Sequence, residues 1–321
     1  LLFFLHVNFL PKWVQCPEFE LQQYWFVLLI FLCFYRYYQG ERKRRGYLAV
    51  SGVLLVGQMF SYPSLIFLYP VYLTGIIRCR KEYAEKKKTP GEALWFTAGS
   101  ALTGILFLAY LGSYITPEKF LRYVSYIFQD ESHTLVSTAV KWKIFGAQFL
   151  EILLPLCIVL GISTAAGTVV ARLSRKRAGI YYALPISFLL LGGLQAAGCL
   201  FGDENQFYML WRFFAVSALG IWMCLAEKTE ENRRCLWFGI LPGFMTLVSV
   251  LIMTNMDVNT SMAKMYIGVI ATVWMLGKHY EMEEEVPDMP VSRRGTVKVW
   301  NVRETEVWEK CLLWAGMLFF L

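Results

Sequence analysis

The sequence predicts an all-α fold, a polytopic bundle of transmembrane helices with about nine crossings, one pair of them a short-helix hairpin, truncated at both ends. Of its 321 residues, 57% are hydrophobic and only 17% are charged, whereas soluble domains carry about 25% charged residues. Apolar runs alternate with basic clusters in short loops, and such clusters stay on the cytoplasmic side of a membrane. The clusters are Arg36 with Arg42–Arg45, Arg78–Lys88, Arg172–Arg177, and Lys228 with Arg233 and Arg234.

The net charge of +7 indicates membrane lipids as a partner and not nucleic acid. The Lys and Arg residues lie in loops beside apolar spans and form no single stripe, so anionic headgroups fit them better. The eight cysteines are scattered and contain no Cys-x-x-Cys pair. They are therefore expected to be packing residues. Together these patterns predict a cell-membrane protein.

The first spans follow from the apolar runs. Leu1–Leu10 is expected to be the last part of a span, and residues 11–23 form an outer loop. Tyr24–Tyr38 then runs inward to the first basic cluster, with tyrosines at the interface. Because the chain opens in one apolar run and stops in another, at Leu321, we expect an internal fragment of a longer protein.

The segment Tyr47–Ile77 is apolar, yet a basic cluster lies at each end of it. A single crossing cannot leave both ends on the same side, so the segment must enter and return. The break is predicted at Ser61-Tyr62-Pro63-Ser64, because Pro63 removes a backbone donor and disfavours helix at Tyr62. The turn is either a tight helical hairpin or an irregular backbone that lines a binding site, with Tyr62 as a candidate ligand-binding residue.

Leu94–Tyr114 crosses outward and leads into the longest outer loop, residues 115–143. Within this loop, Pro117–Phe128 has apolar and charged residues at helical spacing. That pattern predicts an amphipathic helix on the membrane surface.

Five further spans complete a transmembrane domain over residues 1–276, with outer loops at 201–206 and 254–264. Residues 277–310 are expected to be a cytoplasmic polar connection, and residues 311–321 the start of another transmembrane helix. The five spans are Ile144–Ala171, Ile180–Leu200, Phe207–Ala226, Leu236–Met253 and Met265–Leu276, running alternately inward and outward.

Two ionisable residues within spans are candidate binding residues, because a charge in hydrocarbon is costly unless it is paired or faces water. Glu151 and Arg212 are both expected a short way inside the outer surface. The planar guanidinium group of Arg212 could bind an anionic group through two parallel hydrogen bonds. Alternatively, the two residues form a buried ion pair, or Arg212 extends to outer phosphates.

The outer loops contribute further candidates, namely Glu18, Asp130, Glu131 and His133. The cluster from Asp130 to His133 could bind a divalent cation or act as a general base, and no other cofactor is expected. The sequence contains no Gly-rich phosphate loop, no His-Glu-x-x-His motif and no Gly-x-Ser-x-Gly motif.

Three short elements resemble parts of a known family. They are the broken segment with Ser61-Tyr62-Pro63-Ser64, the element Cys16-Pro17-Glu18 ahead of Tyr24–Tyr38, and Trp211-Arg212-Phe213-Phe214. They are similar to elements of GT-C type membrane glycosyltransferases, of the dolichyl-phosphate-mannose mannosyltransferase and aminoarabinose transferase group. The family's prolines do not follow Phe214, and Cys16 stands where Ser is commoner.

The resemblance implies an enzyme that takes a sugar from a polyprenyl-phosphate donor and attaches it to an acceptor on the outer face. It places Arg212 near the donor phosphate and puts the acidic catalytic motif in a first outer loop ahead of Leu1, so no catalytic residue is assigned. Two alternatives remain open. One is a multi-pass transporter or lipid flippase, in which the broken segment lines the path, and the other is a non-catalytic membrane scaffold.

Overall fold

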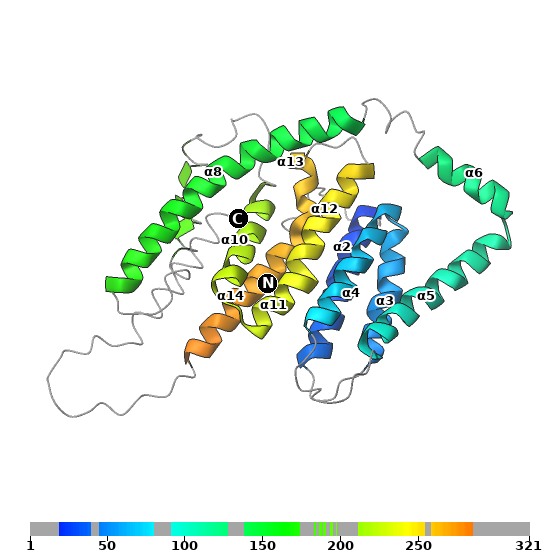
Figure 1. Ribbon diagram of the computed structural model, residues 1–321, viewed down its shortest axis with the longest axis horizontal. Helices are drawn as coiled ribbons and strands as arrows, with labels where there is room; N and C mark the ends of the chain where they lie inside the picture. Colours follow the sequence, from blue (N-terminus) through cyan, green and yellow to red (C-terminus); the bar gives the residue numbers. More distant parts are fainter. Residues whose placement is uncertain are drawn as a thin grey trace.

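The computed structural model describes residues 19–39, 45–79, 91–127, 138–173, 211–253 and 258–284, with separate positions between 183 and 197. Every regular element within these residues is a helix, which confirms the all-α prediction for them (Figure 1). The elements are α2 (Phe19–Gln39), α3 (Gly46–Met59), η1 (Pro63–Phe67), α4 (Leu68–Arg78), α5 (Gly91–Gly112), α6 (Pro117–Ile127), α8 (Thr138–Leu173), α10 (Trp211–Ala226), α11 (Glu230–Cys235), η3 (Leu236–Ile240), α12 (Leu241–Met253), α13 (Val258–Ser261), η4 (Met262–Met265) and α14 (Tyr266–Glu284).

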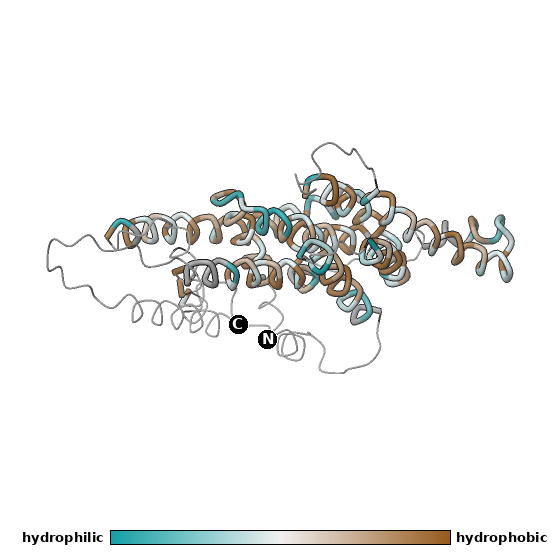
Figure 2. The backbone as a smooth tube through the Cα atoms, turned by 90° about the horizontal axis from the view of Figure 1, so that it is seen from below, coloured by the Kyte–Doolittle hydropathy of each residue, from teal (hydrophilic) through white to brown (hydrophobic). Residues whose placement is uncertain are grey.

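Three helical stretches of the described chain are long and apolar enough to cross a membrane, namely Gly91–Gly112, Ala139–Val170 and Glu230–Ile252. Only 11% of the apolar window in the first is buried inside the protein, against 61% in the third. Helix α5 therefore exposes most of its apolar surface, as a lipid-facing helix does. Figure 2 shows hydrophobic residues along most of the described helices. The structure thus indicates a membrane protein, and the total of about nine crossings stays a prediction.

Small residues bring α3 and α5 into close contact. A Cβ atom added at Gly99 would overlap the carbonyl oxygen of Ala49, and one added at Gly52 would overlap that of Phe96. Gly91 lies near Arg45 at one end of the pair and the Phe60 ring meets Phe107 toward the other, so the two helices are parallel. The Ser100 hydroxyl donates a hydrogen bond to the Gly52 carbonyl oxygen at 3.2 Å. Between membrane helices such close approach replaces the hydrophobic effect as the source of stability.

The helical conformation is interrupted at Tyr62, as the sequence predicted. Tyr62 has extended backbone angles, with φ −145° and ψ 112°, and Pro63 follows as the first residue of the 3₁₀ turn η1. Proline lacks the N–H group that a continuous helix needs here and disfavours helical angles in the residue before it. These two effects account for the break between α3 and α4.

Helix α4 returns toward the end at which α3 began. The Tyr72 ring stacks on Phe34 of α2, with ring centroids 5.4 Å apart. One turn later, a Cβ at Gly75 would meet Phe238, whose ring stacks on Tyr38 further along α2. Helix α4 therefore runs parallel to α2, while α3, which follows α2 after a short connection, runs back. The two arms form the helical hairpin that the sequence predicted.

The two ends of this bundle are marked by different residues. At one end lies the break, and we call it the Tyr62 end. At the opposite end, the Tyr37 hydroxyl at the end of α2 donates a hydrogen bond to Glu92 at the start of α5, at 2.6 Å. We call this the Glu92 end. The ends of α2 and α4 and the beginnings of α3 and α5 all lie there, next to the first two basic clusters.

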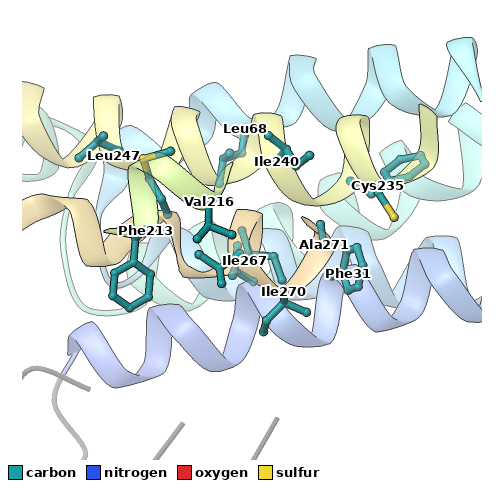
Figure 3. Packing of buried hydrophobic residues seen from close by; sticks show 14 of the residues in the cluster. Phe31, Leu68, Phe213, Val216, Cys235, Ile240, Leu247, Ile267, Ile270 and Ala271 are labelled. Carbon is teal, nitrogen blue, oxygen red and sulfur yellow. The ribbon is translucent and has the colours of Figure 1, made fainter. Parts of the chain in front are cut away.

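Helices α10, η3 with α12, and α14 pack against α2 and α4 to form the core. Figure 3 shows apolar side chains from these elements pointing toward one another, among them Phe31, Leu68, Val216, Ile240 and Ile267. The core is aromatic toward the Glu92 end. There the Phe34 ring of α2 stacks on the Phe238 ring of η3, with centroids 4.2 Å apart.

Several helices extend beyond the apolar runs that predicted them. Helix α2 begins at Phe19 and α8 at Thr138, so both enter the segments predicted as outer loops 11–23 and 115–143. Helix α14 continues to Glu284, into the predicted polar connection. An apolar run indicates which part of a helix a membrane would cover. The helix itself can be longer, because Gln, Glu and Lys residues beyond the run also favour the helical conformation.

The loop predicted at 254–264 is helical over its last seven residues, as α13 and most of η4. Other sequence-based assignments lie outside the described residues: the partial span Leu1–Leu10, the outer loop 201–206, residues 285–310 of the connection and the helix start at 311–321. Of the predicted span Ile180–Leu200, only separate positions are described.

The amphipathic segment after α5 forms helix α6, as predicted. The Thr116 hydroxyl before it accepts a hydrogen bond from the Lys119 N–H at 3.4 Å, which caps the helix start. Figure 1 places α6 beyond the end of α5 and away from the core. Its apolar Leu121 is 69% exposed. Its location on a membrane surface stays a prediction.

The arrangement of the helix ends leads to a labelling prediction. Cysteines introduced at Gly40 and Lys86, which lie outside the described residues, should both be shielded from an impermeant thiol reagent applied to intact cells. A cysteine at Asp203 should react. Labelling is to be measured on a chain whose native cysteines have been replaced. Reaction at Gly40 with protection at Lys86, or the reverse, would show that the hairpin does not return.

Candidate functional site

Several helix ends converge on the break at the Tyr62 end. Turn η1 follows the break, and its Ser64 hydroxyl donates a hydrogen bond to the Ser249 carbonyl oxygen near the end of α12, at 2.9 Å. Helix α2 begins here, since its Tyr24 ring meets Tyr266 at the start of α14 edge-on, 5.3 Å between centroids. Four segments far apart in the sequence therefore surround this point.

A lysine is buried at their centre. Lys264 in η4 is 2% exposed, although the sequence placed it in an outer loop, where it would be solvated. Its Nζ lies 5.1 Å from the centre of the Tyr24 ring and 5.8 Å from that of Tyr62. Each aromatic face attracts the cation, by about 2 kcal/mol where water is excluded. Lys264 therefore connects the first helix of the bundle to the broken segment.

Polar residues lie close in sequence to all three members of this group. Gln23 precedes Tyr24, Ser61 precedes Tyr62, and Ser261 lies one helical turn before Lys264. Gln23 is 1% exposed and Ser261 is fully buried. The amide atoms of Gln23 and the hydroxyl oxygens of Ser61 and Ser261 are buried and have no hydrogen-bond partner within the described chain. We call Lys264, Tyr24, Tyr62, Gln23, Ser61 and Ser261 the Lys264 site.

Such unpaired groups are unusual inside a protein. A buried donor or acceptor without a partner costs roughly 1–3 kcal/mol, so most are satisfied by protein or water. Three residues with such groups are close in sequence to Tyr24, Tyr62 and Lys264. Lys264 itself is a buried cation between two aromatic rings, and a cation can bind an anionic group.

The structure brings the position of Arg212 to the level of Lys264. A Cβ at Gly268 of α14 would lie 2.5 Å from the Ser217 hydroxyl of α10, and one at Gly220 would overlap the Thr272 hydroxyl one turn later. The two helices are therefore parallel and in register. Continued backward by one turn, this register places the backbone of Arg212 beside Lys264, whereas its side chain lies outside what the structure describes.

Glu151 lies on α8 with its side chain exposed. Two residues earlier, the Phe149 ring meets Phe214 of α10, with centroids 5.8 Å apart. Glu151 and Arg212 are thus on neighbouring helices at a similar level, as the sequence suggested. The predicted ion pair between them stays a prediction.

The remaining candidates divide into one that joins the site and four that the structure does not describe. Tyr62 is buried and belongs to the Lys264 site. Glu18, Asp130, Glu131 and His133 lie outside the described residues. Within the described residues no three His, Cys, Asp or Glu side chains come close enough to hold a metal ion, so the predicted divalent cation stays a prediction for the undescribed loop.

Charged residues at the Glu92 end serve packing between helices. Trp274 of α14 donates a ring N–H hydrogen bond to Glu231 of α11 at 3.0 Å, and the Arg234 guanidinium lies 5.3 Å from the Tyr38 ring centre. The Thr229 hydroxyl caps α11 by accepting from the Asn232 N–H at 3.1 Å. These contacts join α11 to α14 and to the end of α2.

Sequence reasoning did not single out Lys264 or Gln23. Lys264 stands between methionines just before the span Met265–Leu276, and a lone basic residue there resembles an ordinary loop end. A usable signal was its apolar surroundings, Met262-Ala263-Lys264-Met265-Tyr266, which contain no other polar residue before the span. Gln23 gave no comparable signal.

Comparisons of the chain with protein-family models, with curated proteins and with solved structures found no match. A functional assignment therefore depends on the site itself and on the short elements noted in the sequence.

Proposed function

We propose that this chain belongs to a membrane-embedded glycosyltransferase that takes a sugar from a polyprenyl-phosphate donor and attaches it to an acceptor on the outer face. The observation that carries the proposal is the buried cation of Lys264 beside the broken segment. A donor of this kind needs a site inside the membrane for its phosphate and an apolar surface for its chain. The Lys264 site and the exposed apolar face of α5 offer both.

Sugar transfer requires that the negative charge that develops on the leaving phosphate be stabilised. An acceptor oxygen forms a bond to the sugar's anomeric carbon and loses its proton, while the bond from that carbon to the phosphate oxygen breaks. The polyprenyl phosphate leaves with the electron pair. Cations near the leaving oxygen stabilise the developing charge, and in a site without water they act strongly. We assign this role to Lys264, and the register of α10 with α14 puts Arg212 at the same level.

A transporter or lipid flippase is the second candidate. It is favoured by the irregular backbone at Tyr62, since broken helices often line substrate paths. The two functions differ in their product, because transport leaves the sugar–phosphate bond intact and transfer cleaves it.

The test uses the full-length protein in sealed vesicles with a polyprenyl-phosphate donor whose sugar is radiolabelled. We expect the label to appear on a water-soluble acceptor. Label that crosses the membrane while still attached to the lipid would support the flippase instead. If neither movement nor transfer of the label occurs with a range of donor sugars and acceptors, the transferase proposal is wrong.

A further inference from the structure

We propose that the exposed face of α8 binds a transmembrane helix of a partner protein, and that this partner helix carries an arginine or a lysine that pairs with Glu151. The proposal goes beyond sugar transfer, because it concerns a face of the bundle that the Lys264 site does not include.

Among the described residues, α8 contacts the bundle with one face. Its Gln148 side chain accepts a hydrogen bond from the Val258 N–H at 3.1 Å, and the buried residues Leu156, Val159, Leu160 and Ser163 lie on the same side. Figure 1 shows α8 at the edge of the bundle. On its opposite side a stripe at helical spacing faces outward, and its large apolar side chains are 54% to 67% exposed, namely Leu150, Leu154, Ile158, Ile162 and Val169.

Glu151 lies on this stripe. It is the single charged residue between Lys143 and Arg172 in the sequence, about 12 Å along the helix axis from Lys143. Its side chain is exposed and forms no hydrogen bond or ion pair within the described chain. Hydrocarbon does not hydrate a carboxylate, so a glutamate inside a span almost always pairs with another group or faces water.

Pro155 leaves a second acceptor at the same residue. It lies inside α8, four residues after Glu151, and has no N–H group. It therefore cannot donate the hydrogen bond that the Glu151 carbonyl oxygen accepts in a regular helix. Membrane helices tolerate such a proline where a neighbouring group, often on another helix, supplies the missing donor. A guanidinium or ammonium group combines a positive charge with several N–H donors, so it satisfies both the carboxylate and the carbonyl oxygen.

Small residues on the stripe permit close approach of a helix. Cys157, Gly161 and Ala165 are spaced by four residues and are all exposed. A Cβ atom added at Gly161 would meet no atom within 4 Å. Where α3 meets α5, this chain already uses small residues, Gly52 and Gly99, to bring two helices together.

A second copy of this chain fits the face less well. Two copies of α8 in contact through this stripe would bring a second carboxylate toward Glu151 and no cation. Charge complementarity therefore favours a partner helix with a basic residue.

The experiment measures binding of transmembrane peptides to the purified protein in nanodiscs, by energy transfer between dyes on the two. The peptides share a Leu-Ala sequence and carry Arg, Leu or Glu at one position, which is moved by one turn through the set so that one member matches the depth of Glu151. We expect the wild type to bind the matching Arg peptide about tenfold more tightly than the Leu or Glu peptide, as one charge-assisted contact allows. Glu151→Leu, a change on an exposed apolar face, should abolish this preference.

Two glycines provide a matched pair of variants. Gly161 on the proposed face and Gly104 on α5 both have open space around an added Cβ, so leucine at either position should leave the fold intact. Gly161→Leu should weaken binding of the Arg peptide by at least about threefold, because it holds the two helices apart. Gly104→Leu should bind it as the wild type does.

Three results would overturn the proposal. The first is equal binding of the Arg and Leu peptides to the wild type. The second is self-association of the protein that Glu151→Leu abolishes, which would assign the face to a second copy. The third is binding of the Arg peptide that occurs only in Arg212→Gln, which would show that Arg212 occupies Glu151 in the wild type. The assay contains no sugar donor, so its outcome is independent of the proposed sugar transfer.

Discussion

Replacing Gly99 by alanine is expected to destabilise the bundle by about 3 kcal/mol, at the upper end of the usual range for overpacked cores. The added Cβ would overlap the Ala49 carbonyl oxygen, which is backbone and cannot change rotamer. Helices α3 and α5 would have to separate. That movement would also weaken the Ser100 hydrogen bond to Gly52.

The same helix supplies a control. Gly104, further along α5, has open space around the position of an added Cβ. Gly104→Ala should be neutral or slightly stabilising, by at most about 1 kcal/mol, because alanine favours helix over glycine. Thermal unfolding of both variants in the same detergent checks the expectation. Equal stability of Gly99→Ala and Gly104→Ala would mean that α3 and α5 do not pack as closely as described.

The broken segment shows what local sequence can predict. The break needs only Pro63 and its effect on Tyr62, and the return needs only the basic clusters on either side. Both signals are within the segment, so no knowledge of other helices is required. Helix α6 was predicted in the same way, from spacing within one segment, and the all-α class from apolar runs that alternate with basic clusters.

The burial of Lys264 could not be predicted from the residues around it in the sequence. Its burial depends on Tyr24 and Tyr62, which lie far away in the sequence and are brought to it by the packing of α2 and η1. Local hydropathy assigned it to a loop, because a charged residue at the edge of an apolar run usually faces water. The close contact of Gly99 with Ala49 is equally non-local. A sequence without aligned relatives gives no sign of which glycines face another helix.

Arg212 is the site residue that the sequence singled out from its own span, and its substitution is expected to reduce sugar transfer strongly. Arg212→Gln removes the charge and the two-pronged geometry, whereas Arg212→Lys keeps the charge alone. We expect little transfer from the first and partial transfer from the second. The loss of a charge-assisted contact, roughly 1.5–3 kcal/mol, corresponds to about tenfold to a hundredfold weaker donor binding.

The measurement is transfer by full-length protein in vesicles, with the amount of inserted, folded protein determined in parallel. Arg172→Gln serves as the control, because Arg172 is exposed in the last turn of α8, at a basic cluster predicted to be cytoplasmic. It should transfer sugar as the wild type does.

The ion-pair alternative predicts a different pattern. If Arg212 pairs with Glu151, Arg212→Gln leaves a carboxylate without its partner, so the amount of folded protein should fall. Adding Glu151→Gln should then restore it. Normal folding with unchanged transfer in Arg212→Gln would contradict both roles and leave Lys264 as the cation of the site.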